Sequence, residues 1–106
     1  MDVDASGTAI GAVLSQIQND KEVVVRYASK YFSQDQARYC TTKRELLGLV
    51  WALKTFRFYL HERHFLVRTD HASIRWWRTM DAAMPDVILR WLQYASSFDF
   101  EVAYRP

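Results

Sequence analysis

The chain has 106 residues, of which half are hydrophobic, 15% are aromatic and 25% are charged, with only three glycines and two prolines. This composition excludes a disordered, collagen-like or low-complexity protein, and the length predicts one domain with a small core. The formal net charge of +2 permits nucleic-acid binding without indicating it, and the absence of any run of 18 apolar residues excludes a transmembrane helix.

The first 28 residues predict three β-strands joined by tight turns. The opening residues precede a Ser-Gly turn signal, and residues 9–17 begin apolar and then alternate between apolar and polar side chains. A polar, turn-like segment at residues 19–21 is followed by a β-branched run over residues 23–28. The chain therefore begins as a series of short strands.

The next segment predicts an amphipathic helix over residues 43–60. Its apolar side chains repeat at spacings of three and four, the period of a helix that buries one face. The residues of this stripe are Leu46, Leu49, Val50, Leu53, Phe56 and Leu60. Thr42, followed by Glu45 three residues later, has the spacing of a capping box and marks the start of the helix. Residues 64–70 then alternate and predict a fourth strand.

Two more helices and a last strand are predicted downstream. Residues 72–80 predict a short helix, and Pro85 suits the first position of a further helix. The apolar positions of that further helix are Ile88, Trp91, Leu92 and Ala95. Strict alternation over residues 98–104 predicts a half-buried strand. The order β-β-β-α-β-α-α-β predicts an α/β fold, in which helices pack on a mixed sheet.

Three carboxylates occupy positions where a site can form. If the first and fourth strands are parallel neighbours, Asp4 and Asp70 lie side by side at their carboxyl ends, and Glu45 approaches from the long helix. Three converging carboxylates repel one another unless a cation neutralises them, and oxygen ligands select Mg²⁺ or Mn²⁺. Two such ions about 4 Å apart can activate a water molecule and stabilise the leaving oxygen in phosphodiester cleavage.

Each of these carboxylates also has a structural interpretation. Acidic residues are common at strand ends, and the capping box alone would explain Glu45. Asp2 competes with Asp4, because residues two apart face the same side of a strand. From spacing alone, both interpretations stay open.

Four blocks of sequence occur in a fixed order and cover nearly the whole chain. They comprise residues 4–6 (DAS) with 10–16 (IGAVLSQ), residue 39 with 41–47 (TTKRELL), 50–54 (VWALK) and 56–60 (FRFYL), residues 69–71 (TDH) with 73–74 (SI), and residues 98–102 (FDFEV) with 104–106 (YRP). Together these blocks resemble the ribonuclease H domain of gypsy-type retroelement polyproteins.

The resemblance implies a ribonuclease H-like fold with a five-stranded mixed sheet and flanking helices. It implies an enzyme that cleaves the RNA strand of RNA–DNA hybrids by two-metal-ion catalysis, next to a reverse transcriptase domain of the same polyprotein. Asp4, Glu45 and Asp70 are then the catalytic acids and the ligands of two Mg²⁺ or Mn²⁺ ions, and Asp4 is preferred over Asp2.

The resemblance also implies substrate contacts by Ser6, Thr41, Thr42 and His71. Thr42 is at the same time the predicted helix cap, and His71 is equally a surface residue at a strand end. The 2′-hydroxyl group in the minor groove is the physical feature by which such a site distinguishes a hybrid from duplex DNA.

The chain departs from the family pattern at its end. The family takes a fourth acidic residue from a final helix beyond a Tyr-Arg-Pro-Gly stretch, whereas this sequence stops at Pro106. We therefore expect residues 1–106 to form one ribonuclease H-like domain without its C-terminal helix. The expected consequences are weaker binding of the second ion, impaired activity, and an apolar sheet surface that invites association.

Aromatic and basic residues allow two interpretations. Residues 75–78 (RWWR) suit a stacking platform, but a hybrid keeps its bases stacked, so core packing of the tryptophans is favoured. Trp51 and Trp91 are expected in the core. Three arginines, namely Arg44, Arg57 and Arg63, are interpreted either as phosphate contacts or as part of a solvated helix face.

The remaining features bear on location and on an alternative function. Cys40 is the single cysteine, so it cannot form an internal disulfide, and no signal peptide is indicated by the acidic first residues. We expect an intracellular protein, in a cytoplasmic virus-like particle or in the nucleus, with no membrane partner. The alternative to the enzyme is a non-catalytic ribonuclease H-like module, a connector or a co-opted host domain, that binds nucleic acid or protein.

Overall fold

A computed structural model describes residues 1–70 and 86–104, so the helix predicted over residues 72–80 and His71 lie outside the described residues. The strands are β1 (Asp2–Ala5), β2 (Ala9–Gln18), β3 (Lys21–Tyr31), β4 (His64–Thr69) and β5 (Asp99–Tyr104). The helices are α1 (Gln34–Ala37), α2 (Thr41–Thr55), α3 (Arg57–Leu60) and α4 (Asp86–Ser96). None of these helices is long and apolar enough to cross a membrane.

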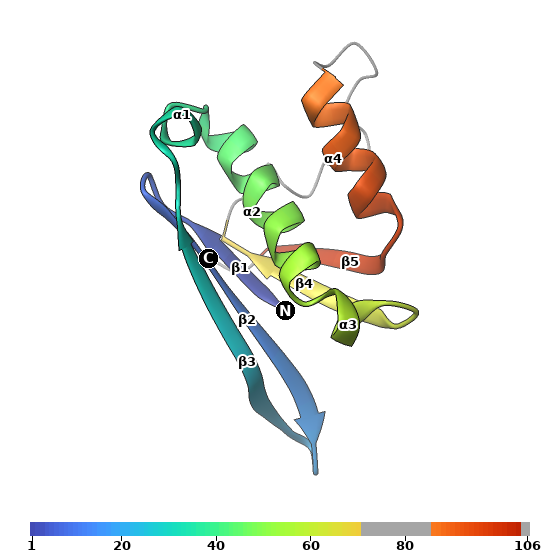
Figure 1. The fold of residues 1–106 in the computed structure, drawn as a ribbon. Coiled ribbons are helices and arrows are strands. Elements are labelled where there is room, and N and C mark those ends of the chain that lie inside the picture. The colour runs from blue at the N-terminus through green and yellow to red at the C-terminus, as the bar shows by residue number, and fades with distance from the viewer. Residues whose placement is uncertain (71–85, 105–106) are drawn as a thin grey trace.

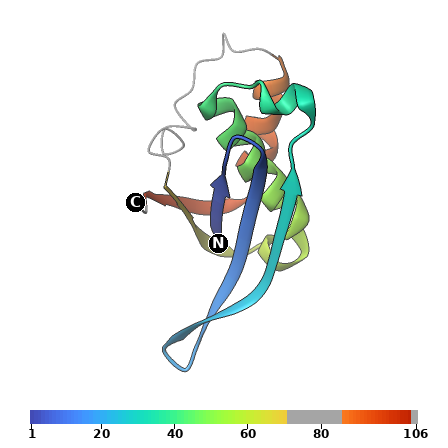
Figure 2. The same cartoon turned by 90° about the vertical axis from the view of Figure 1, so that its left-hand side faces the viewer.

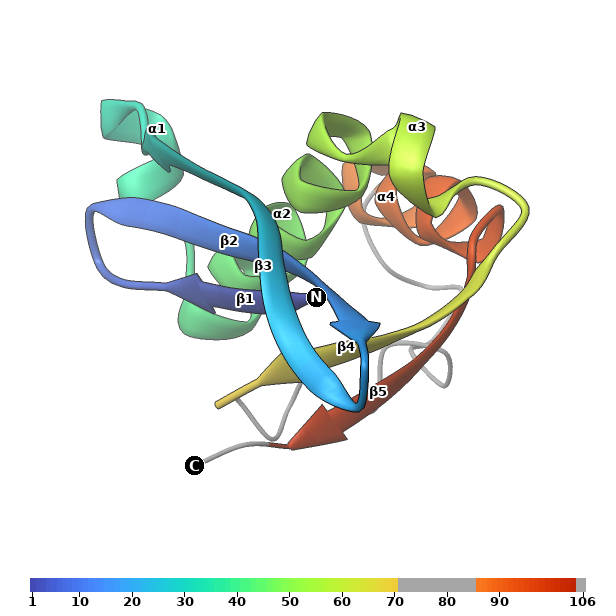
Figure 3. The same cartoon turned by 90° about the horizontal axis from the view of Figure 1, so that it is seen from below.

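The five strands form one mixed sheet in the order β3-β2-β1-β4-β5. β1, β2 and β3 pair in antiparallel fashion, whereas β4 runs parallel to both β1 and β5. The helices gather on one side of this sheet (Figures 1 and 3). The predicted mixed sheet, and the parallel neighbourhood of the first and fourth strands, are both confirmed.

The β2–β3 hairpin extends beyond the rest of the sheet (Figure 2). Asn19 and Asp20 connect its strands with φ angles of 52° and 61°, the left-handed backbone that a two-residue hairpin turn requires. The pairing register shifts between Leu14 and Ser15, which indicates a β-bulge. β3 continues to Tyr31, past the predicted end, because its backbone keeps pairing with β2 beyond the β-branched run.

The apolar stripe of α2 packs against the inner face of the sheet. All six predicted stripe residues are buried. All of them except Val50 belong to one core cluster with strand residues that include Val3, Ile10 and Val67. Gly48 permits this close approach, since a Cβ atom there would lie 3.3 Å from Cγ2 of Ile10. Trp51 and Trp91 are half-buried and pack against the core, as predicted.

The boundaries of the long helix differ from the prediction. α2 begins at Thr41, after Cys40 as N-cap, so the capping box predicted at Thr42 and Glu45 is wrong. A capping box instead starts α1, where the Ser33 hydroxyl accepts from the Gln36 amide and the Gln36 side chain accepts in return from the Ser33 amide. α2 also stops one residue before Phe56, which has φ −104° and ψ 19° and separates α2 from α3.

Candidate active site

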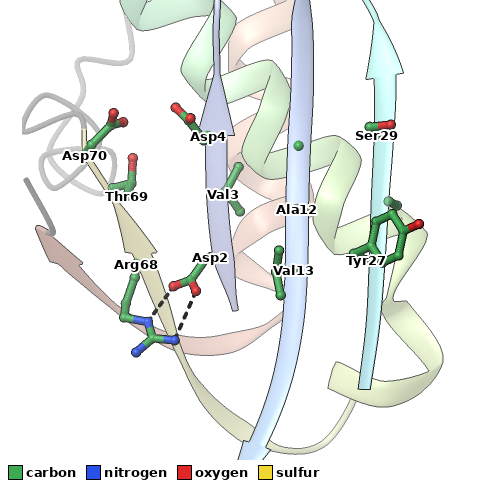
Figure 4. A pocket seen from close by; sticks show the side chains of 12 residues that line it. Asp2, Val3, Asp4, Ala12, Val13, Tyr27, Ser29, Arg68, Thr69 and Asp70 are labelled. Atoms are coloured by element: carbon green, nitrogen blue, oxygen red, sulfur yellow. Dashed lines mark hydrogen bonds and ion pairs between the residues drawn. The ribbon is translucent and has the colours of Figure 1, made fainter. Parts of the chain in front are cut away.

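The register of β1 and β4 brings two predicted site residues together. Asp2 is the register partner of Arg68, so Asp4 and Asp70 each lie two residues further along parallel chains. Alternation along β1 buries Val3 on the helical side and turns Asp4 to the opposite, open face. The carboxylates of Asp4 and Asp70 are both exposed and lie at neighbouring strand ends (Figure 4).

Glu45 reaches the same region from α2. It follows the first turn and precedes the buried Leu46, and only 2% of its surface is exposed. The pKa of Glu45 is raised to about 8, first by burial and then by the negative charges of Asp70 and Asp4, while Arg44 opposes the shift. Asp4 and Asp70 are therefore close enough to Glu45 to raise its pKa.

The chemistry of this donor set fits a hard divalent cation. Carboxylate oxygens are the ligands that Mg²⁺ and Mn²⁺ prefer, and a cation would remove the repulsion that favours protonated Glu45. In the described part of the chain, no three His, Cys, Asp or Glu side chains form a ready-made metal cluster. Mg²⁺ is commonly held by one or two carboxylates with water and substrate phosphate, which matches an exposed Asp4–Asp70 pair backed by Glu45.

A hollow of about 480 Å³ adjoins the two exposed carboxylates on the open face of the sheet. Its walls come from β1, β2, β3 and β4 and include Gly11, Tyr27 and Ser29 beside Asp4 and Asp70. Figure 4 shows the side chains of Asp4, Tyr27, Ser29 and Asp70 on or beside the strands, with the helices behind the sheet. The candidate site is thus open to a large ligand from the face that the helices do not cover.

Asp2 has a different environment from Asp4. Its two carboxylate oxygens accept from the Arg68 guanidinium, with Nη2–Oδ2 at 3.0 Å (Figure 4). Arg68 also donates to Glu22 of β3, with Nη1–Oε2 at 3.4 Å. Sequence analysis did not find this network, because the pairing of residues 2 and 68 becomes visible only once the strand register is known.

The proposed substrate-contacting residues are only partly placed near the acids. Thr41 and Thr42 form the first turn of α2, just before Glu45, with Thr41 exposed and Thr42 half-buried. The Ser6 hydroxyl accepts from the backbone amides of Thr8 and Ala9, which stabilises the turn after β1. His71 falls outside the described residues.

Of the three arginines considered as phosphate contacts, two bond to the chain itself. Arg44 donates to the carbonyl oxygens of Ala37 and Tyr39, at 3.2 and 2.8 Å, and so secures the loop before α2. Arg57 donates to the Lys54 carbonyl oxygen and lies over the Phe58 ring, 4.6 Å from its centroid. The Arg63 side chain is exposed. The solvated-face interpretation is therefore favoured for Arg57, and a loop-securing role for Arg44.

Comparison with known proteins identifies the family of this chain. The family model described as "RNase H-like domain found in reverse transcriptase" matches residues 1–98. The Pol polyprotein of transposon 297 from Drosophila melanogaster is 37% identical over 102 residues, which cover 95% of this chain and 9% of that polyprotein. The Tf2-3 transposon polyprotein of Schizosaccharomyces pombe is 36% identical over 111 residues, covering all of this chain and 8% of that polyprotein.

The chain thus spans less than a tenth of the length of these polyprotein relatives. Among solved structures, ribonuclease H1 of Halobacterium salinarum is similar with a TM-score of 0.62 and 19% sequence identity. That match covers all of this chain and 86% of the archaeal one. At this identity the likeness shows a shared ribonuclease H-like fold.

Proposed function

This chain belongs to the family of RNase H-like domains found in reverse transcriptase, and from that premise we propose that it hydrolyses the RNA strand of RNA–DNA hybrids. The activity would serve reverse transcription, with a reverse transcriptase domain in the same polyprotein, because the relatives are Pol polyproteins of transposons. The corresponding location is intracellular, in a cytoplasmic particle or in the nucleus. The observation that carries the proposal is the placement of Asp4 and Asp70 two residues beyond the register pair of the parallel strands β1 and β4, beside the open hollow.

Asp4 and Asp70 would hold Mg²⁺ or Mn²⁺ at the open face, where a phosphodiester can approach from solvent. When bound, a pair of such ions supplies the charge neutralisation that attack on a phosphodiester anion requires. Glu45 lies behind this pair, and a bound cation would favour its ionised form. Its burial keeps solvent away from the inner side of the site.

Thr41 and Thr42 precede Glu45 by one helical turn, and we assign to them the polar contacts with the hybrid. A hydroxyl group near the acids suits a 2′-hydroxyl partner, which only the RNA strand offers. His71, next to Asp70 in the sequence, is proposed as a further contact.

The test is a cleavage assay with end-labelled RNA in a hybrid, and with the same strands as duplex DNA, over a titration of Mg²⁺ or Mn²⁺. We expect metal-dependent cleavage of the RNA strand alone, and its loss in Asp4→Asn and Asp70→Asn. Asp35→Asn is the matched control, because Asp35 is an exposed carboxylate on α1 that takes no part in the site. Binding of the hybrid without any cleavage would instead support the non-catalytic module.

A further inference from the structure

We propose that Asp2 and Arg68 are positioning residues, whose ion pair keeps Asp4 and Asp70 beside each other for cation binding. This inference rests on the proposed function, since it concerns the same site. Neither residue touches the phosphate in this account. The Asp2–Arg68 pair acts through the strands on which the two site carboxylates stand.

The backbone ladder alone does not fix the separation of the site carboxylates. Within the described residues, β1 and β4 share a single register pair, Asp2 with Arg68. β4 ends at Thr69, and Asp70 lies in a bend beyond the last strand residue. The last point at which the two chains are held in register is therefore two residues before the site.

Electrostatics makes a link at that point necessary. Asp4 in β1 and Asp70, just beyond the end of β4, carry like charges, and such neighbours push the two chain segments apart. One pleat earlier, on the same face, Arg68 bonds both carboxylate oxygens of Asp2. An attractive pair next to a repulsive one holds the strand ends together, and the planar guanidinium fork fixes the geometry as well as the distance.

Arg68 is itself held from a third strand. Its guanidinium also bonds Glu22, which follows the turn of the β2–β3 hairpin. Only 24% of the Arg68 side chain and 30% of the Asp2 side chain are exposed, so the pair is shielded from solvent better than an ordinary surface ion pair. Side chains from β1, β3 and β4 thus meet at one guanidinium, directly before the site.

Positioning and simple electrostatics predict opposite results for one substitution. Arg68→Met removes a positive charge near the site, so the surrounding potential becomes more negative. If only the potential mattered, Mn²⁺ would bind more tightly. If the Asp2–Arg68 pair positions the carboxylates, Mn²⁺ binds more weakly despite the more negative potential.

The experiment measures Mn²⁺ affinity by electron paramagnetic resonance on the 106-residue chain without nucleic acid, at constant pH. We expect affinity to fall about tenfold in Arg68→Met, the effect typical of residues that orient metal ligands. Arg68→Lys, which keeps the charge but loses the fork, is expected to recover part of this loss. Arg63→Met, which removes a remote exposed arginine, is expected to bind Mn²⁺ as the wild type does.

Unchanged or tighter Mn²⁺ binding by folded Arg68→Met would overturn the inference. If Arg68→Met does not fold, Mn²⁺ affinity of Arg68→Lys equal to that of the wild type would overturn it instead. Amide hydrogen exchange separates this inference from the proposed function. Should the wild type bind no Mn²⁺, the proposed function is wrong, while faster exchange in β1 and at Thr69 of Arg68→Met would still support the role of the pair. Exchange equal to that of Arg63→Met would refute it.

Discussion

The two faces of the sheet are built from the same strands and have opposite characters. In β1, Val3 and Ala5 are buried under α2, while Asp2 and Asp4 alternate with them and stand on the open face. The covered face obtains its stability from apolar burial, which amounts to about 25 cal/mol per Å². The open face gathers carboxylates and one arginine, which contribute little stability and carry the chemistry.

Alternation along a strand therefore places residues that stabilise the fold next in sequence to residues that belong to the site. A change on the covered face is expected to alter the free energy of unfolding. A change on the open face is expected to alter ligand binding while the fold persists. Glu45 is the exception, because it is buried with the core and yet belongs to the site.

The largest effect is expected on the covered face. Leu53→Ala removes a side chain with no exposed surface from the last turn of α2, and the cavity lowers the free energy of unfolding by about 3–5 kcal/mol. Urea denaturation followed by circular dichroism measures this loss. The free energy of unfolding of Asp4→Asn, measured in the same way, should differ from that of the wild type by less than about 1 kcal/mol. A loss as large as that of Leu53→Ala would show that the open face also stabilises the fold.

Glu45 is expected to make stability depend on pH in the absence of divalent ions. Its pKa is about 8 in the folded chain and 4.5 in the unfolded chain, so the folded state binds the extra proton. The contribution of protonated Glu45 to stability is therefore fully present below pH 4.5, and it is lost as the pH rises to about 8. Glu45→Gln should abolish this fall and be more stable than the wild type at pH 8.5, by on the order of 3 kcal/mol.

The measurement is urea denaturation between pH 5 and pH 8.5, in a buffer that contains a chelator. Adding Mg²⁺ at pH 8.5 should stabilise the wild type and leave Glu45→Gln nearly unchanged. The same dependence of the free energy of unfolding on pH in the two proteins would show that ionisation of Glu45 does not destabilise the folded chain.

Substitution of one glycine on each face tests the same difference. Gly48 on α2 approaches Ile10 so closely that the branched side chain of Gly48→Val has no room, and we expect a loss of about 1–3 kcal/mol. Gly11 is the register partner of Asp4, and within the described part of the chain nothing lies within 4 Å of a Cβ atom added there. Gly11→Ala should therefore leave the unfolding midpoint nearly unchanged. A large loss at Gly11 would mean that the open face is covered.

The smallest effect is expected for the exposed pair of His64 in β4 and Asp99 in β5. His64 bonds Asp99 through Nδ1 at 3.0 Å, and this hydrogen bond raises the pKa of His64. The stabilisation is present below pH 6.5 and is lost as the pH rises through the raised pKa. Asp99→Asn should lower the pKa of His64 in an NMR titration with almost no change in unfolding. An unaltered titration curve would show that the two side chains do not interact in solution.

Much of the fold followed from local patterns. The stripe from Leu46 to Leu60 predicted the buried face of α2, and the Asn19-Asp20 turn predicted the β2–β3 hairpin. The break at Phe56 was missed, because apolar spacings of three and four continue across it and periodicity cannot register a local change of backbone. The capping box was assigned to the wrong helix, although Ser33 and Gln36 have the same spacing as Thr42 and Glu45.

The site could be predicted only in part. Asp4 and Asp70 were named from strand ends and from family resemblance, and their proximity then followed from the β1–β4 register. Asp2 could not be separated from Asp4 by spacing, because its partner Arg68 is 66 residues away in the chain. The burial of Glu45 was also beyond prediction, since a residue in the second turn of a helix faces the core or solvent according to tertiary packing.

The central claim is that Asp4, Glu45 and Asp70 together bind the divalent cation that hybrid cleavage requires. The most direct measurement is a crystal structure of the chain grown with Mn²⁺, in which anomalous scattering locates manganese. We expect a manganese peak about 2 Å from carboxylate oxygens of Asp4 and Asp70, with the Glu45 side chain turned towards it. Crystals saturated with Mn²⁺ that bind it elsewhere and leave these carboxylates without a cation would contradict the account.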